Sequence, residues 1–256
     1  SGGASGAVRY EHTTDGPAHG SLRLLQLYPR DMNIYGDWGN TLVLARRAQW
    51  QGYDVELLSY DPGDELPGDV DILVGGGGQD SGQERIKEDL VKVGPTLKAW
   101  AADGVPMLAI CGLYQLFGHG FTTAKGKEIP GISLMDTHTV AGDTRLIGNI
   151  TLDTEDFGAV IGYENHSGLT TLGPDAHPFG TVRMGDGNNG KDGTEGGRVH
   201  HVIGTYLHGS LLPKNPAVAD WLLARAVEHS GATWEPEPLD DTWAERARTV
   251  AMSRPR

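Results

Sequence analysis

Disulfide bonds and membrane spans are both excluded by what the sequence lacks. It contains a single cysteine, Cys111, in 256 residues, so no internal disulfide can form. A chain with a single cysteine and no disulfide suits a reducing compartment, so we expect a cytoplasmic protein. No apolar run approaches the roughly 20 residues that a membrane-spanning helix requires. The N-terminal residues also lack the basic and then apolar pattern of a secretory signal. We therefore expect no transmembrane segment.

Positive charge is scarce as well. The chain has 21 Lys and Arg residues against 34 Asp and Glu residues, a net charge of −13, and no long basic cluster. A nucleic-acid backbone would be repelled by this surface, so we expect no nucleic-acid partner. Glycine, in contrast, is abundant at 38 residues, well above the usual share of about 7%. The glycines are not periodic and gather beside predicted strands, where a backbone can approach a ligand closely.

The first half of the chain alternates short apolar runs with longer helical patterns. Strands are predicted over residues 22–28, 55–60, 70–74 and 105–110, and helices over residues 41–52 and 83–103. Alternation of this kind indicates right-handed crossovers, so we predict an α/β fold with a central, mostly parallel sheet flanked by helices.

The second half has a different pattern. We predict short strands over 144–152, 159–164 and 180–183, a polar loop over 185–197, a strand over 198–207, and helices over 215–230 and 243–252. The polar loop lacks the Lys-Ser/Thr pair of a phosphate-binding loop, and we interpret it as a surface loop near the site or at a partner interface. The organisation we expect is a flexible leader over 1–20, one domain over 21–231, and a C-terminal tail with a short helix over 232–256.

Cys111 stands where a predicted strand, 105–110, meets the start of a predicted helix at 112–117. A sharp turn from strand to helix lifts the side chain out of the sheet. The partial positive charge of a helix N-terminus also favours the thiolate form of a cysteine. The alternative is a small buried core cysteine, which is the more common fate of a lone Cys.

Four features fall at the carboxyl ends of predicted strands, where ligands bind in open α/β sheets. They are Cys111, the glycine run 75–78, His208 and Asp37. A cysteine and a histidine are the minimum set for acyl transfer, since the imidazole activates the thiol and then protonates the leaving amine. Backbone N–H groups of the glycine run would hold a developing oxyanion. Taken singly, a plain turn explains the glycine run and a loop-capping carboxylate explains Asp37 equally well. A structural histidine is the favoured explanation for His208 when it is considered alone.

Three segments carry a family resemblance. The segment AICGLYQ at 109–115 resembles the nucleophile elbow of class I, or triad-type, glutamine amidotransferases. The segments GYENHSG at 162–168 and GTYLHG at 204–209 resemble the two later motifs of the CobB/CobQ, or cobyric-acid-synthase, branch of that family. The resemblance implies a flavodoxin-like fold with antiparallel additions in the second half. It also implies that L-glutamine is the substrate.

The same resemblance implies roles for individual residues. Cys111 is expected to form a glutamyl thioester and His208 to act as general base and acid. Arg145 is expected to bind the α-carboxylate of glutamine, which suits the bidentate geometry of a guanidinium. Gly77 and Gln115 are the remaining substrate-binding candidates, with Gly77 supplying an oxyanion N–H.

The sequence departs from the family at the third member of the triad. Class I enzymes usually carry His-x-Glu, but Gly209 and Ser210 follow His208 here. Asp37 is our first candidate for the missing orienting acid and Glu164 is the second. His138, His166, His200 and His201 do not match any standard zinc spacing, and we expect no metal site.

Further segments narrow the resemblance to the glutaminase subunits of lipid II isoglutaminyl synthases. They lie at 33–40, 76–80, 128–131, 144–148 and 187–192. The resemblance implies a MurT-like, ATP-dependent Mur ligase partner that holds ATP and Mg²⁺, with no cofactor in this chain. Trp234 and Trp243 in the tail are either anchors for that partner or residues that pack back on the domain. An amidotransferase for corrinoid amidation and a catalytically inactive binding subunit are the alternatives.

Overall fold

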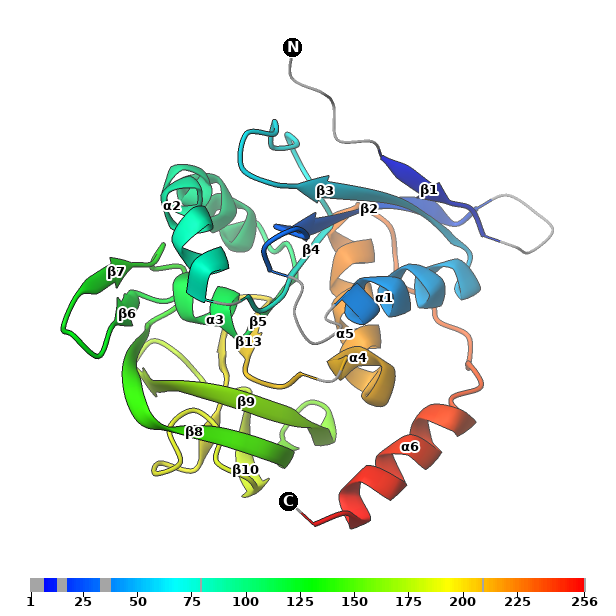
Figure 1. Ribbon diagram of the computed structural model, residues 1–256. Helices are drawn as coiled ribbons and strands as arrows, with labels where there is room; N and C mark the ends of the chain where they lie inside the picture. Colours follow the sequence, from blue (N-terminus) through cyan, green and yellow to red (C-terminus); the bar gives the residue numbers. More distant parts are fainter. Residues whose placement is uncertain (1–6, 13–17, 33–37, 79, 209, 256) are drawn as a thin grey trace.

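Two β-sheets and the helices packed on them form the frame of the protein (Figure 1). The computed structural model describes residues 7–12, 18–32, 38–78, 80–208 and 210–255. The strands are β1 (Val8–Tyr10), β2 (Gly20–Leu27), β3 (Tyr53–Tyr60), β4 (Ile72–Gly75), β5 (Met107–Ile110), β6 (Gly120–Thr122), β7 (Glu128–Pro130), β8 (Thr137–Thr154), β9 (Gly158–Leu172), β10 (Gly180–Met184), β11 (Thr194–Glu195), β12 (Gly197–Val199) and β13 (Val202–Thr205). The helices are α1 (Trp38–Trp50), α2 (Asp80–Ala102), α3 (Gly112–Phe117), α4 (Leu211–Lys214), α5 (Pro216–His229) and α6 (Thr242–Ser253).

The first sheet has the strand order β1-β3-β2-β4-β5-β13-β12. Its five central strands are parallel, and the two edge strands β1 and β12 are antiparallel to their neighbours. Helices α2 and α3 cover one face of this sheet, and α1 and α5 cover the other (Figure 1). The predicted α/β fold with a mostly parallel sheet is confirmed. Strands buried on both faces are continuously apolar, which is why β4 and β5 could be recognised from sequence.

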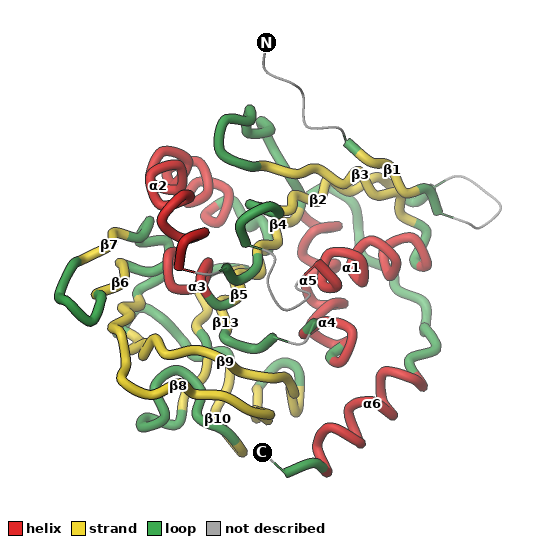
Figure 2. The backbone as a smooth tube through the Cα atoms, in the orientation of Figure 1, coloured by secondary structure: helices red, strands yellow, loops and turns green. Residues whose placement is uncertain are grey.

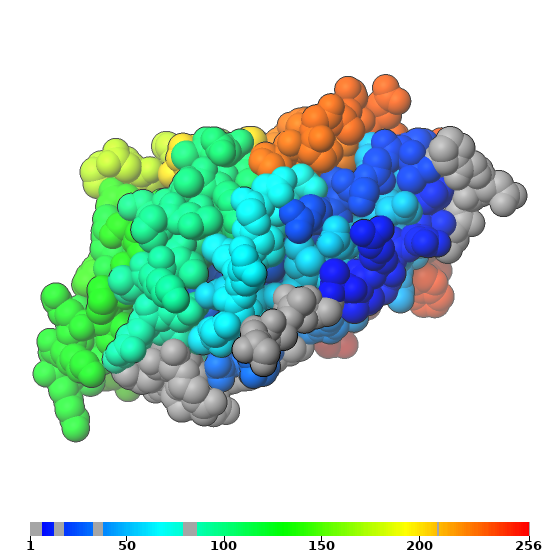
Figure 3. Space-filling view, turned by 90° about the horizontal axis from the view of Figure 1, so that it is seen from above, coloured from blue at the N-terminus to red at the C-terminus, as the bar shows by residue number. Residues whose placement is uncertain are grey.

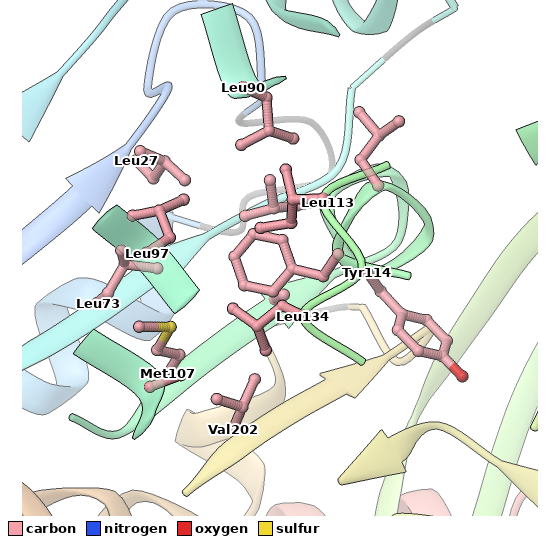
Figure 4. Close-up of a cluster of buried hydrophobic side chains, with 14 of the residues drawn as sticks. Leu27, Leu73, Leu90, Leu97, Met107, Leu113, Tyr114, Leu134 and Val202 are labelled. Carbon is pink, nitrogen blue, oxygen red and sulfur yellow. The ribbon is translucent and has the colours of Figure 1, made fainter. Parts of the chain in front are cut away.

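An apolar cluster fills the space between the sheet and α2 (Figure 4). Leu73 and Met107 come from the sheet, and Leu90 and Leu97 come from α2. Each of these side chains is almost completely buried. Burial of one such side chain stabilises the fold by about 1.5–3 kcal/mol. Leu113 of α3 points into the same cluster, so the residues directly after Cys111 are anchored in the core (Figure 4).

The second sheet is dominated by the long hairpin of β8 and β9, with β10 and β6 on the other side of β8. The prediction of short strands at 144–152 and 159–164 was wrong in length, because both belong to this hairpin. Its exposed face mixes polar residues with apolar ones such as Val140 and Ile147, which hides the apolar alternation of a half-exposed strand. The register shifts between Ala141 and Leu146, so residues 142–145 form a bulge in β8. The hairpin of β6 and β7 projects at one end of the molecule (Figure 3).

The strand predicted over 198–207 is two strands. Val199 of β12 pairs with Val202 of β13, so His200 and His201 form a two-residue turn between antiparallel strands. His200 has a φ of 49°, as turns of this kind require. The sequence hides the turn because two histidines replace the usual Asn or Gly.

Both terminal regions contact the main body of the protein. Val8–Tyr10, within the segment expected to be a leader, pairs with β3. In the tail, the ring of Trp234 stacks on Tyr53, so this tryptophan packs back on the domain. Helix α6 lies at the rim, beside β9 (Figures 1 and 2), where Trp243 is 77% exposed. In the part of the chain that the structure describes, no helix has the length and apolarity needed to cross a bilayer.

Candidate active site

Cys111 occupies a strained turn between β5 and α3. Its backbone has a φ of 52° and a ψ of −107°, which a residue with a side chain rarely adopts. The Cys111 N–H donates to the carbonyl of Thr205 at 2.8 Å, and the Cys111 carbonyl accepts from the N–H of Gln115 at 3.0 Å. The turn is therefore held by the neighbouring strand on one side and by the first helical turn on the other. A strained strand-to-helix turn is typical of a nucleophile elbow.

Two glycines let α3 lie close to the sheet. A Cβ atom added to Gly75 would stand 2.1 Å from Cδ2 of Leu113, and one added to Gly204 would stand 2.3 Å from Cδ1 of Tyr114. Any side chain at either position would displace the Leu113 or Tyr114 side chain, or the helix that carries them. Gly75 is also paired in register with Ala109, so Gly77 and Cys111 each lie two residues after this pair on neighbouring strands. That position suits the predicted contribution of Gly77 to an oxyanion hole.

His208 lies beyond the end of β13, the strand on the other side of β5. Thr205 is in register with Ile110, and His208 follows three residues later. The side chain is buried, with 1% of the residue exposed. Its backbone pairs in both directions with Tyr163 of β9, through N···O distances of 2.7 and 3.3 Å. The residues predicted as nucleophile and base therefore stand at the carboxyl ends of adjacent parallel strands.

Gln115 lies one helical turn after Cys111 and faces the strand of His208. Its Nε2 donates to the hydroxyl of Tyr206 at 3.0 Å, and that hydroxyl lies 2.7 Å from Oγ1 of Thr170. The ring of His166 stacks on Tyr206 with centroids 3.6 Å apart and planes 5° apart. A buried polar network therefore joins the elbow helix, β9 and the strand of His208.

Arg145 lies in the bulge of β8 and is exposed. Its Nη1 donates to Oδ1 of Asn165 on β9 at 2.9 Å. Gly168 on the same strand lies against the elbow helix, because a Cβ added there would stand 2.5 Å from Nε2 of Gln115. The bulge thus holds the guanidinium at a solvent-facing position on a strand that borders the site. Its role in binding glutamine stays a prediction.

Of the two acids predicted to orient His208, the structure describes only Glu164. Asp37 lies outside the described residues. Glu164 is fully buried on β9, directly after the residue that pairs with His208. It accepts backbone hydrogen bonds from Asp186 at 3.1 Å and from Gly187 at 3.2 Å, and its Oε1 lies 3.4 Å from Nε2 of His166.

Comparison with known proteins connects this geometry to a family. The model of the CobB/CobQ-like glutamine amidotransferase domain matches residues 23–216. The chain belongs to this family. The resemblance predicted from the three motifs is confirmed.

Two relatives cover most of the chain. Subunit GatD of the glutamine-hydrolysing lipid II isoglutaminyl synthase of Staphylococcus aureus is 37% identical over 227 residues, covering 87% of this chain and 91% of GatD. The subunit of the same name from Streptococcus pneumoniae is 37% identical over 219 residues, covering 84% of each chain. A probable cobyric acid synthase of Methanoregula boonei is 36% identical over 52% of this chain and 28% of its own length. The protein is accordingly a glutamine amidotransferase.

Solved structures agree on the fold. PurLQS from Thermotoga maritima superposes with a TM-score of 0.56 at 13% identity, covering 82% of this chain and 98% of that one. A second glutamine amidotransferase from Thermotoga maritima has a TM-score of 0.53 at 16% identity, covering 90% of this chain and 93% of that one. At these identities the likeness concerns the fold alone.

Sequence reasoning missed one buried acid in this amidotransferase. Glu195 is fully buried and accepts hydrogen bonds from the Oγ1 of Thr205 at 2.8 and 3.0 Å and from the N–H of Tyr206 at 2.7 Å. Burial raises the pKa of Glu195 to about 8. The negative charge of Glu164 raises this pKa as well, whereas the positive charge of His208 lowers it. No sequence signal pointed to Glu195, because it lies in a polar stretch between glycines.

The loop over 185–197 makes a buried hydrogen bond to α3, the helix that follows Cys111. Asn188 is fully buried, and its Oδ1 accepts from the Tyr114 hydroxyl at 2.9 Å and from the N–H of Gly196 at 3.0 Å. The prediction that the loop lies near the site is confirmed. The prediction of a surface loop was wrong for Asn188 and Glu195, because both side chains are buried. Asn188 accepts a hydrogen bond from α3, and Glu195 accepts one from β13.

Three of the four histidines that we considered as metal ligands contact different groups. His166 stacks on Tyr206, His201 contacts the carbonyl of Gly104, and His138 lies beside Thr122. In the described segments, no group of three or more His, Cys, Asp or Glu side chains is placed to hold a metal ion.

Proposed function

We propose that the protein is the glutaminase subunit of a lipid II isoglutaminyl synthase. It would hydrolyse L-glutamine and deliver ammonia to a MurT-type ligase, which amidates the α-carboxylate of the D-glutamate in lipid II during peptidoglycan synthesis. The observation that carries the proposal is the pairing of the strained Cys111 elbow with His208 at the end of the adjacent strand. The similarity to GatD across 84–87% of this chain supports the choice of synthase.

The proposed reaction proceeds in two steps through Cys111. The thiolate Sγ attacks the carboxamide carbon of glutamine, and the carbonyl oxygen becomes an oxyanion next to the N–H groups at Gly77 and after Cys111. When the C–N bond breaks, the His208 imidazolium protonates the departing nitrogen and ammonia leaves. A water molecule, deprotonated by His208, then attacks the thioester and releases glutamate.

Binding of the substrate requires contacts at its amino-acid end. We propose that Arg145 binds the α-carboxylate, since its guanidinium is exposed on a strand that borders the elbow. Gln115 lines the same region from the helix side. Glu164 is the described acid that we retain as an orienting candidate, with Asp37 as the other.

We expect the ligase chemistry to reside on the partner. ATP and Mg²⁺ would bind there, and this chain would need no cofactor of its own. The amidotransferase domain would comprise residues 21–231, with the tail over 232–256 as an addition. Of the two tail tryptophans, Trp243 on α6 is 77% exposed and is the one we propose as an anchor for the partner. A cytoplasmic location would suit this role.

The proposal is tested with the full chain, alone and with its ligase partner. Wild-type protein should release glutamate from L-glutamine and support glutamine-dependent amidation of lipid II, and Cys111→Ser and Cys111→Ala should abolish both. Glutamate release that persists in both variants would remove Cys111 from the reaction. Absence of release by wild-type protein in the complex would favour an inactive binding subunit. Amidation of a corrinoid in place of lipid II would reassign the synthase.

A further inference from the structure

The carboxyl group of Asp89 on α2 accepts hydrogen bonds from two tyrosines of the first sheet. The Tyr28 hydroxyl donates to Oδ2 of Asp89 at 2.6 Å, and the Tyr60 hydroxyl donates to Oδ1 at 3.0 Å. The two tyrosine rings meet edge to face with centroids 5.7 Å apart, and both residues are buried. Tyr28 follows β2 and Tyr60 ends β3, so one carboxyl group joins α2 to the carboxyl ends of two strands.

Both tyrosines keep their protons when the protein is folded. Burial raises the pKa of the Tyr28 phenol, and the hydrogen bond to Asp89 raises it further. Burial raises the pKa of Tyr60 as well, and the same carboxyl group adds to the effect. Tyr28 and Tyr60 therefore remain hydrogen-bond donors at neutral pH.

Tyr28 also occupies an unusual backbone position. Its φ is 53°, in the left-handed region that residues with a side chain rarely adopt. The Tyr28 N–H donates to the carbonyl of Tyr60 at 2.7 Å, and the Tyr28 carbonyl accepts from the N–H of Met32 at 2.9 Å. Residues 28–32 thus form a turn, the Tyr28 turn, directly after β2. Such a conformation persists only where its surroundings hold it, and Asp89 holds the side chain of its first residue.

The Tyr28 turn lies against the glycine run that follows β4. A Cβ atom built on Gly78 would stand 2.5 Å from the carbonyl oxygen of Asp31 and 2.5 Å from Sδ of Met32. The backbone of Gly78 is therefore in close contact with the turn. Gly77, whose N–H is the proposed oxyanion donor, is the residue directly before it. A shift of the Tyr28 turn would consequently move the donor.

Helix α2 is a firm support for this contact. Leu90, the residue after Asp89, is almost completely buried in the apolar cluster that also contains Leu27 and Leu113 (Figure 4). The turn of α2 that carries Asp89 is thereby fixed to the core, and through Leu113 to the helix that follows Cys111.

We propose that Asp89 is a positioning residue for the oxyanion N–H of Gly77 and that it acts through Tyr28. The inference rests on the proposed glutaminase function. Asp89 holds the Tyr28 turn to α2, the turn holds Gly78, and Gly78 sets the direction of the preceding N–H. An oxyanion donor has to lie about 2.7–3.1 Å from the developing charge, so a small displacement of the glycine run weakens the stabilisation.

Two reactions of Cys111 respond differently to such a displacement. Hydrolysis of glutamine passes through an oxyanion on the former carbonyl oxygen. Alkylation by iodoacetamide forms a bond from Sγ to a saturated carbon while the C–I bond breaks and iodide leaves, so no oxyanion develops. Loss of the Asp89 contacts should slow the first reaction and leave the second unchanged. Because Cys111 is the only cysteine, intact mass reports its alkylation directly.

The test compares the wild type with Asp89→Ala, Asp89→Asn and Glu88→Ala. Glu88 is the exposed neighbour of Asp89, so Glu88→Ala removes a carboxyl group from the same helix and is the matched control. Glutamine turnover is measured with the full chain in complex with its ligase partner. Alkylation by iodoacetamide at neutral pH is measured on the full chain.

Loss of one oxyanion donor costs about 100- to 1000-fold in kcat, and we expect displacement of the donor in Asp89→Ala to cost roughly 10- to 100-fold. KM for glutamine should stay unchanged, and alkylation should proceed at the wild-type rate. Asp89→Asn keeps one acceptor oxygen and should have an intermediate kcat, and Glu88→Ala should match the wild type. A wild-type kcat in Asp89→Ala would overturn the inference. Alkylation slowed in proportion to kcat would also overturn it, because the elbow as a whole would then be disturbed.

A pair of tyrosine variants keeps the test decisive if Asp89→Ala does not fold. Tyr28→Phe and Tyr60→Phe each remove one hydroxyl that donates to Asp89 and retain the buried ring. We expect the lower kcat in Tyr28→Phe, because only Tyr28 belongs to the turn that contacts Gly78, and equal values would contradict the proposal. Failure of the function itself is distinguishable, since the wild-type complex would then release no glutamate from glutamine.

Discussion

The side-chain amide of Gln115 donates to the hydroxyl of Tyr206 at 3.0 Å, which links the helix after the nucleophile to the strand that leads to the base. Gln115 lies four residues after Cys111, and Tyr206 lies two residues before His208. The contact is buried and continues from Tyr206 to Thr170 on β9. The relative position of the two proposed catalytic residues therefore depends on side-chain hydrogen bonds as well as on the sheet.

Tyr206→Phe should weaken this link. The change removes one hydroxyl and leaves its buried neighbours short of a partner, which costs about 1–3 kcal/mol of stability. We also expect kcat/KM for glutamine to fall. Urea unfolding and glutaminase assays measure the two effects. Tyr53→Phe is the matched control, since the Tyr53 hydroxyl makes only a 3.4 Å contact with the carbonyl of Thr233, remote from the elbow. Equal behaviour of the two variants would contradict the prediction.

Arg145→Ala should raise KM for glutamine. A charged hydrogen bond to a carboxylate contributes about 1.5–3 kcal/mol, so an increase of roughly 10- to 100-fold is expected. Steady-state kinetics with L-glutamine measure the change. Arg183→Ala is the control, because Arg183 is an exposed arginine of β10 that pairs with Asp153. A fall in kcat without a change in KM would show that Arg145 does not bind the carboxylate.

Gly75→Ala should disturb the elbow from the neighbouring strand. The new methyl group would stand 2.1 Å from Cδ2 of Leu113, so the buried Leu113 side chain or α3 has to move. Overpacking of this kind costs about 1–3 kcal/mol, and glutaminase activity should fall beyond the loss of folded protein. Gly68→Ala is the control, since nothing lies within 4 Å of a Cβ at that position. Full activity in Gly75→Ala would show that the elbow tolerates displacement.

Asp241→Asn should release the tail. Arg47 is buried and donates to Asp220 at 2.8 Å and to Asp241 at 2.6 Å. Burial by itself lowers the pKa of Arg47, but the hydrogen bonds to these two acids outweigh it and raise the pKa, so Arg47 stays charged. Limited proteolysis should cut the variant between α5 and α6 faster than the wild type, while glutamine hydrolysis stays unchanged. Glu235→Gln, an exposed change in the same tail, should behave as the wild type. An unchanged cleavage rate in Asp241→Asn would mean that other contacts hold α6.

Glu195 should make stability depend on pH. Its folded-state pKa of about 8 lies above the ordinary value, so the folded protein binds a proton that the unfolded chain releases. The stabilising contribution is complete below the ordinary pKa of a glutamate and is lost as the pH rises through about 8. The Tm advantage of wild type over Glu195→Gln should therefore shrink between pH 5 and 9, by about 5 °C or more. A widening difference would reverse the assigned sign.

Local patterns were sufficient for the parallel sheet and for the elbow. Strands buried on both faces read as unbroken apolar runs, and the glycine or helix signals that follow them mark their ends. The carboxyl ends of such strands lie at one edge of the sheet, so Cys111, Gly77 and His208 could be grouped before the fold was known. The hairpin of β8 and β9 was harder to predict, because its exposed face mixes polar and apolar residues.

The amino-acid sequence by itself determined the fold class, the position of Cys111 at a turn and the family. Each of these depends on short patterns of neighbouring residues. Tertiary structure alone decided which side chains meet around the site. Glu195 became a buried partner of Thr205 and Tyr206 because the loop over 185–197 folds back beneath the elbow. The environment of a carboxyl group is set by its burial and its donors, and the donors of Glu195 lie 10 and 11 residues further along the chain, brought back to it by the hairpin of β12 and β13.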